Sequence, residues 1–197
     1  MQNRLTSMLV LSLALVTSGC SHDMNNSDIK QNPHPAKRYE LTVAAQGAPG
    51  PFESATGFMQ YDIANPDCAP KDPVSGARPT PEYTPDIAFI RVSDTEFKGT
   101  IYLDLPVDEN YFGLGVCHWK FIAAGVSIKA NGVRFSPVIS IEDIVANNPV
   151  STFFSKDSYN EKSSKGRDDL GLPNKAEQPA IDHPELFFKV IISAKEQ

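Results

Sequence analysis

Three cysteines carry the most reactive side chains of this 197-residue chain: Cys20, Cys68 and Cys117. Cys20 ends an N-terminal apolar segment, where its thiol could accept lipid. Two thiols then remain, and in an oxidising compartment they most simply pair. A Cys68–Cys117 disulfide would close a loop of about 50 residues and contribute roughly 4 kcal/mol in the chain-entropy model. The alternative is a reactive Cys117 with His118 as its base, which is disfavoured because adjacent strand residues point to opposite faces.

The first twenty residues have the pattern of a secretory signal peptide. Arg4 gives the positive charge, residues 8–16 are apolar, and three small residues lead into Cys20. The apolar run is too short to span a membrane. A cysteine at the cleavage point is similar to a bacterial lipoprotein signal, although Thr17 stands where leucine is usual. The alternative is an ordinary cleaved signal with an incidental cysteine.

Acylation of Cys20 would decide where the chain resides. Each buried methylene contributes about 0.8 kcal/mol, so more than one acyl chain gives stable anchoring. Ser21 follows Cys20, a pattern that resembles lipoproteins passed to the outer membrane. We therefore expect a protein that faces the periplasm and touches the membrane only through its lipid anchor.

Other residue patterns that could support catalysis are missing from the sequence. It contains no Gly-x-Ser-x-Gly or His-Glu-x-x-His motif and no glycine-rich phosphate loop. The four histidines are isolated or in the N-terminal segment, and none pairs with cysteine at zinc spacing. We expect no enzyme activity, no catalytic residue and no cofactor.

One acidic cluster could be interpreted as a calcium site. Asp104, Asp108 and Glu109 lie close together in sequence but lack the glycine turn of a dedicated calcium loop. A solvated strand end is the favoured interpretation, and we expect no metal site.

The charge of the chain limits its partners. It has 18 basic and 24 acidic residues, and removal of residues 1–19 takes Arg4 away, leaving a net charge of about −7. That balance argues against nucleic acid as a partner. Residues 20–37 are polar and predict a flexible tether, whereas residues 38–197 suit one domain with its own core.

Alternation of apolar and polar residues, typical of half-buried strands, runs through this domain. It predicts strands at residues 38–46, 59–63, 87–92, 100–105, 119–129, 133–141 and 186–194. Residues 119–129 form either two short strands broken at Gly125 or one bulged strand. Asn131 and Gly132 predict a two-residue hairpin turn, because both tolerate positive φ. Seven to nine strands with turns between them favour an antiparallel β-sandwich.

Few segments depart from the strand pattern. Ser140 predicts the N-cap of the one plausible helix, residues 141–147. In the last strand, Leu186 is expected to face inward. Residues 64–86 and 155–184 are long polar loops, and loops of such length are usually functional or disordered.

Three blocks of sequence carry a resemblance to a known family. They are residues 48–52, residues 66–70 running on to 75–78, and residues 111–119, of which Cys117-His118-Trp119 is the most specific part. Together they resemble small Gram-negative periplasmic lipoproteins encoded beside type VI secretion phospholipase effectors. Members of that family act as immunity proteins, so the resemblance implies a secreted Ser-His-Asp lipase as the partner.

The residues of the interface are a separate prediction. The 155–184 segment is our first candidate, with Tyr159, Arg167, Asp168 and Asp169 as contacts, since aromatic and arginine anchors often dominate such surfaces. The alternative is that this loop is only solvated. Tyr111 and Phe112 form a second candidate patch, for which core packing is favoured. Two other functions stay open: a structural or assembly lipoprotein of the envelope, and a small-ligand carrier.

Overall fold

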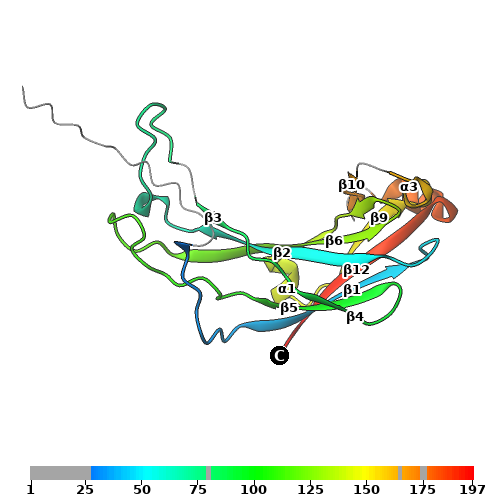
Figure 1. Ribbon diagram of the computed structural model, residues 1–197, viewed down its shortest axis with the longest axis horizontal. Helices are drawn as coiled ribbons and strands as arrows, with labels where there is room; N and C mark the ends of the chain where they lie inside the picture. Colours follow the sequence, from blue (N-terminus) through cyan, green and yellow to red (C-terminus); the bar gives the residue numbers. More distant parts are fainter. Residues whose placement is uncertain (1–27, 79–80, 164–165, 174–176) are drawn as a thin grey trace, which may run out of the picture.

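A computed structural model describes residues 28–78, 81–163, 166–173 and 177–197 (Figure 1). Twelve strands form two sheets within these residues, and six of the strands have three residues or fewer. The strands are β1 (Arg38–Gln46), β2 (Ser54–Ile63), β3 (Glu82–Tyr83), β4 (Phe89–Arg91), β5 (Glu96–Tyr102), β6 (Trp119–Ala130), β7 (Val133–Phe135), β8 (Val138–Ser140), β9 (Val150–Ser155), β10 (Arg167–Asp169), β11 (Leu172–Pro173) and β12 (Phe187–Glu196).

The two sheets make a β-sandwich, as the sequence predicts. One sheet has the order β11-β9-β12-β1-β5-β4, and the other has the order β10-β7-β6-β2-β3, with β8 also paired to β6. Figure 1 shows β2 and β6 above β1, β5 and β12. The pairing is antiparallel as predicted, except that the three-residue strand β10 runs parallel to β7. The very short strands raise the count above the seven to nine expected.

Period-two alternation places the core side chains of the first sheet. On β1 every second residue from Tyr39 to Ala45 is buried. On β12 the same holds from Phe188 to Ala194, and Val43 lies opposite Ile192. Leu186 was expected to begin this inward row and does not. It is exposed, because it lies in a 3₁₀ turn before β12 begins.

The long strand β6 resolves the alternatives for residues 119–129 in favour of one bulged strand. The irregularity lies at Ile122, where the pairing steps from Gln60–Ala123 to Tyr61–Phe121. Gly125 sits inside the strand for a different reason. A Cβ there would lie 2.6 Å from the ring of Phe58, so only glycine lets this ring cover the strand.

The turn after β6 and the start of the first helix follow the prediction, although the helix ends at Val145 and not at residue 147. Asn131 and Gly132 have φ of 51° and 79° and connect β6 to β7. The expected return strand 133–141 is split in two, since Pro137 cannot donate to a strand ladder. Helix α1 (Ile141–Val145) begins as expected, with the Ser140 hydroxyl accepting from the Asp143 amide at 3.3 Å.

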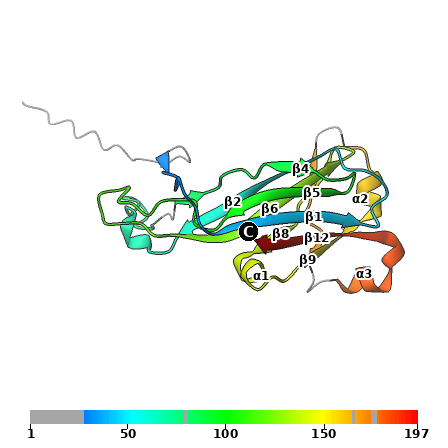
Figure 2. The same ribbon diagram turned by 90° about the horizontal axis from the view of Figure 1, so that it is seen from below.

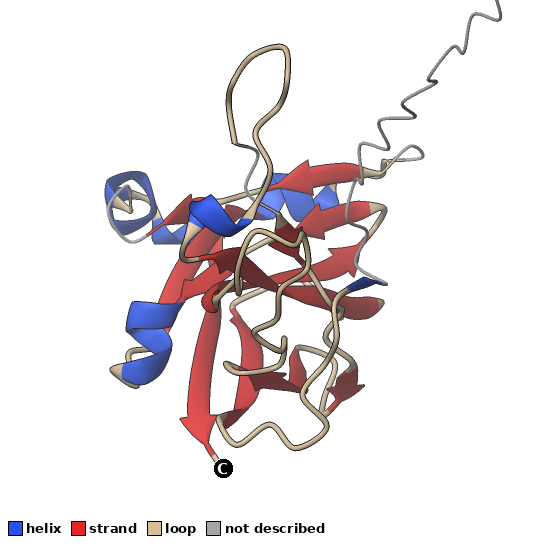
Figure 3. Cartoon of the chain, turned by 90° about the vertical axis from the view of Figure 1, so that its left-hand side faces the viewer, coloured by secondary structure: helices blue, strands red, loops and turns tan. Residues whose placement is uncertain are grey.

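Further elements lie in segments that we expected to be loops. Strand β9 is absent from the sequence prediction. Within residues 155–184 lie β10, β11 and two helices, α2 (Lys156–Asn160) and α3 (Gln178–Asp182), so the expectation of a single helix is wrong. Figure 2 shows α2 and α3 at one end of the sandwich and the long loops at the other. Figure 3 is a view onto the end with the long loops.

Two predicted strands have different bounds because of contacts that are distant in sequence. The expected strand 87–92 is shortened to β4, since the preceding residues 85–87 pair with β2 of the other sheet. The expected strand 100–105 ends at Tyr102, because residues 103–107 turn away to bond with residues 30–37.

The prediction of a loose tether up to residue 37 is wrong for residues 28–37. Ile29 is buried, and the Asn32 amide donates to the Leu105 carbonyl at 2.7 Å. The Asp104 carboxylate accepts from the amides of Ala36 and Lys37. The ordered domain therefore begins before Arg38. Residues 20–27 of the predicted tether lie outside the described residues.

An aromatic cluster fills the core at one end of the sandwich. Phe135 contacts Phe154 and Phe188, each with ring centroids 5.3 Å apart, and Phe52 and Tyr159 complete the cluster. At the other end, the buried Tyr61 hydroxyl of β2 donates to the Tyr102 carbonyl of β5 and so links the two sheets. Each edge-to-face ring contact in the aromatic cluster adds about 0.5–1.5 kcal/mol beyond area burial.

Neighbouring phenylalanines on β9 test this description of the core. Phe154 is 1% exposed and faces the cluster, whereas Phe153 is half-buried on the opposite face. We expect Phe154→Ala to lower the free energy of unfolding by about 3–5 kcal/mol, and Phe153→Ala to lower it far less. Urea unfolding followed by circular dichroism measures both values. Equal losses for the two variants would contradict the burial pattern of β9.

Candidate functional site

Tyr159 is not the partner contact that the sequence analysis expects. Its side chain is 5% exposed, and its ring packs at 5.6 Å from that of Phe52. Its hydroxyl donates to the Pro51 carbonyl at 2.6 Å. Burial also raises the pKa of this hydroxyl. The segment around Tyr159 is polar, but α2 turns this one ring into the core.

The other three expected contacts are held by their own chain. The Asp168 carboxylate accepts two hydrogen bonds from Arg134, at 2.6 and 2.9 Å. Arg167 pairs with Glu161 at 3.0 Å, and the half-buried Asp169 accepts from the Gly171 amide. Arg167 and Asp168 are exposed. A partner contact through them stays a prediction, but it would compete with these existing pairs.

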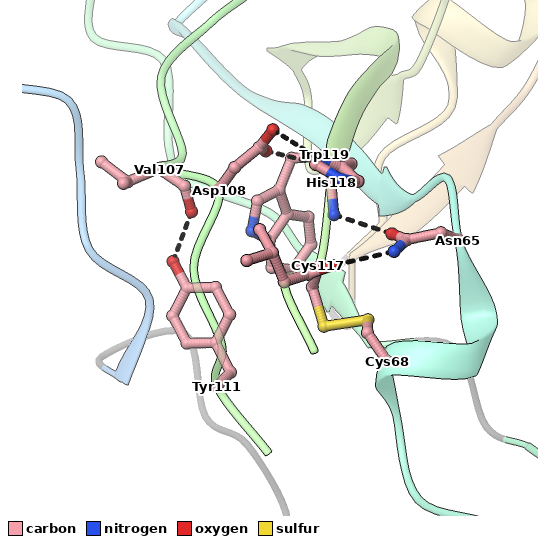
Figure 4. Close-up of polar contacts among 9 residues, drawn as sticks. Asn65, Cys68, Val107, Asp108, Tyr111, Cys117, His118 and Trp119 are labelled. Atoms are coloured by element: carbon pink, nitrogen blue, oxygen red, sulfur yellow. Dashed lines mark hydrogen bonds and ion pairs between the residues drawn. A yellow bond between two sulfur atoms is a disulfide. The ribbon is translucent and has the colours of Figure 1, made fainter. Parts of the chain in front are cut away.

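Long loops meet at the opposite end of the sandwich, around a disulfide. Cys68 and Cys117 are bonded, with Cα atoms 5.3 Å apart, which confirms the predicted pair. Both residues are buried in a small cluster with Ile63, against which Tyr111, Phe112 and Trp119 pack. We call residues 64–69 and 108–119 the disulfide end (Figure 4). Because Cys117 is oxidised and buried here, it is not the reactive thiol of the alternative hypothesis.

Two side chains hold the backbone around Cys117 from both sides. Asn65 donates from Nδ2 to the Val116 carbonyl at 2.8 Å and accepts at Oδ1 from the His118 amide at 2.7 Å. Asp108 accepts from the Trp119 amide at 2.8 Å (Figure 4). These side-chain bonds supplement two backbone bonds of this irregular segment, from the Cys117 amide to the Glu109 carbonyl and from the Ala64 amide to the His118 carbonyl.

His118 forms an exposed pair with Asp108, whose Oδ2 lies 2.7 Å from the histidine Nδ1. A histidine oriented by a carboxylate is one part of a hydrolase triad, which also needs a nucleophile on the other ring nitrogen. The ring contact that the structure describes for His118 is this one with Asp108. The His118–Asp108 pair therefore adds another link between Asp108 and the start of β6.

The sequence signals for Asn65 and Asp108 are weak. Asn65 precedes Pro66 directly after β2, a position where asparagine commonly starts a turn. From the sequence, Asp108 is a candidate only for a calcium ligand. Asp104 and Glu109 of the same cluster bind residues 36–37 and Lys30, respectively. Among the described residues, no group of three acidic, histidine or cysteine side chains is placed to hold a metal ion.

Residues 110–116, which we call the tip loop, project two apolar side chains from the disulfide end. Leu114 is 55% exposed and Val116 is 45% exposed. Gly113 and Gly115 flank Leu114 with φ of 76° and 119°, which a residue with a side chain rarely adopts. Phe112 and Tyr111 are half-buried against the disulfide cluster, in line with the packing favoured for them from the sequence.

Comparisons with protein families, with curated proteins and with solved structures found no match. No helix in the described part of the chain is long and apolar enough to cross a membrane. The predicted signal peptide, residues 1–19, and Cys20 lie outside the described residues. Secretion and lipidation therefore stay predictions.

The disulfide leads to a direct chemical prediction. Before reduction, Cys68 and Cys117 should contribute no free thiol in the unfolded protein, and after reduction they should contribute two. Loss of the bond through Cys68→Ser with Cys117→Ser should lower the free energy of unfolding by about 4 kcal/mol, because the bond closes a long loop. Thiol titration and urea unfolding measure these two effects. Two reactive thiols in the unreduced protein would contradict the bond.

The Arg134–Asp168 pair leads to a pH prediction. The two hydrogen bonds from Arg134 hold the pKa of the Asp168 carboxyl below its ordinary value of 3.8. A depressed folded-state pKa stabilises the fold above that ordinary value, and the effect is lost as the pH falls through the folded-state pKa. Arg134→Ala should raise the pKa of Asp168, measured by NMR titration of its carboxyl carbon. Arg167→Ala is the control and should leave that pKa unchanged.

Proposed function

We propose that this chain is a periplasm-facing lipoprotein that binds and occludes a type VI secretion lipase effector, and so acts as an immunity protein. One observation carries the proposal: two of the three sequence blocks that resemble the lipoprotein family lie together at the disulfide end. Residues 66–70 and 111–119 are far apart in sequence, yet the Cys68–Cys117 bond joins them. The third block, residues 48–52, lies in the turn between β1 and β2 and contributes Phe52 to the aromatic core.

The disulfide also supports the cellular location. Disulfides persist in the bacterial periplasm and are rare in the cytosol. A disulfide-bonded domain that follows a signal-like segment ending at Cys20 is consistent with an envelope lipoprotein. Lipidation at Cys20 would hold this domain at the membrane where a phospholipase acts.

Occlusion is a mechanism that needs no chemistry from this chain. A stable complex buries about 800 Å² on each partner. Loops that are already ordered before binding lose less conformational entropy when the complex forms. The disulfide end meets this requirement through its covalent bond and through the hydrogen bonds of Asn65 and Asp108. Inhibition would therefore be stoichiometric.

The test uses the full-length lipoprotein, reconstituted in phospholipid vesicles, and the lipase encoded beside its gene. We expect phospholipid hydrolysis to fall to background at a molar ratio of about one, since each inhibitor molecule covers one active-site cleft. Light-scattering chromatography of the mixture in detergent should give a complex of the two chains. Unchanged hydrolysis at micromolar inhibitor would refute the proposal. A small ligand that stays bound through purification would favour the carrier alternative instead.

A further inference from the structure

The N-terminal segment enters the domain at the disulfide end. Residues 28–37 lie along residues 103–109, which lead into the tip loop. The Val107 amide donates to the Lys30 carbonyl at 2.9 Å, and the Lys30 ammonium pairs with Glu109 at 2.6 Å. Gln31 donates to the Tyr83 hydroxyl at 2.6 Å. The first described residues after the predicted lipid anchor are therefore attached beside the segment that leads into the tip loop.

The length of chain between the anchor and this attachment sets a limit on distance. Cys20 precedes Asp28 by eight residues, which span at most about 29 Å when fully extended. Strand β6 runs from Trp119, at the disulfide end, to Ala130, and twelve strand residues extend about 40 Å. A lipid on Cys20 would therefore keep the disulfide end, rather than the end that carries α2 and α3, close to the membrane.

The tip loop presents apolar side chains at this membrane-facing end. Leu114 projects between two glycines, and Asn110 accepts from the Gly115 amide at 3.2 Å to hold the turn. The Tyr111 hydroxyl donates to the Val107 carbonyl at 2.6 Å and holds the base of the loop (Figure 4). The loop is thus ordered while Leu114 and Val116 remain in solvent, an arrangement that lowers the entropic cost of binding.

We infer that the tip loop is the surface that docks on the lipase, with Leu114 and Val116 inserted into the apolar mouth of its substrate cleft. This inference rests on the proposed function. Leu114 and Val116 match the chemistry of an acyl-chain site, which is lined by apolar groups. The lipid surface itself is a poorer match, because residues 110–116 carry no basic side chain for anionic headgroups, and Lys30 beside them is already paired with Glu109.

The test compares two exposed leucines at opposite ends of the domain. Leu114→Asp places a charge in the tip loop, and Leu170→Asp places one on a residue that is 72% exposed between β10 and β11. We expect Leu114→Asp to weaken inhibition of the lipase by about 30-fold or more, since a charge at a central apolar contact acts as a hot-spot loss. Leu170→Asp should inhibit like the wild type.

Two substrates separate the possible outcomes, each measured with the lipoprotein in zwitterionic vesicles. Inhibition of a water-soluble short-chain ester, as well as of vesicle phospholipid, supports docking on the lipase cleft. Inhibition of vesicle hydrolysis alone would show that the loop acts on the lipid surface and would overturn the inference. Equal inhibition by wild type and Leu114→Asp would also overturn it while leaving the proposed function intact. A wild type that never binds the lipase would instead remove the proposed function.

Discussion

The Cys68–Cys117 bond holds together two long loops that share few backbone hydrogen bonds. One loop follows β2 and the other leads into β6, so the bond extends the β2–β6 pairing beyond the ends of these two strands. Hydrogen bonds between this backbone and the side chains of Asn65 and Asp108 then set the path of residues 116–119. A single such hydrogen bond contributes only about 1 kcal/mol. They can fix the loop because the covalent bond has already removed most of its alternative conformations.

The parts of the fold that the sequence predicts are those set by neighbouring residues. Alternation along β1 and β12, the Asn131-Gly132 turn and the Ser140 cap depend on side chains within a few positions of one another. Strand β9 escaped prediction because its adjacent Phe153 and Phe154 obscure the period of two. The early end of β5 depends on residues 30–37, and such pairing across the chain leaves no local pattern. The same pairing explains why the N-terminal segment is ordered further than its polar composition suggests.

In the candidate site, too, the sequence predicts what residue type decides and not what depends on distant contacts. Counting cysteines was enough to predict the disulfide, because a covalent pair requires only two suitable thiols. Tyr159 was misjudged, since its exposure depends on Pro51, more than 100 residues away. Asn65 and Asp108 are surface-type residues by composition, and their roles arise only from where the folded loops bring them. Residue type thus predicted the bond, whereas the side chains that shape the loop around it required the three-dimensional arrangement.

The two ends of the sandwich differ in what a partner would have to displace. At the end with α2 and α3, Arg134 and Asp168 already satisfy each other, and Arg167 is paired with Glu161. A partner that used these charges would first break those pairs, and the replacement contacts would gain little net free energy. At the disulfide end, Leu114 and Val116 face solvent on an ordered loop. Covering them releases water and breaks no bond of the free chain, so the free energy of association favours this end.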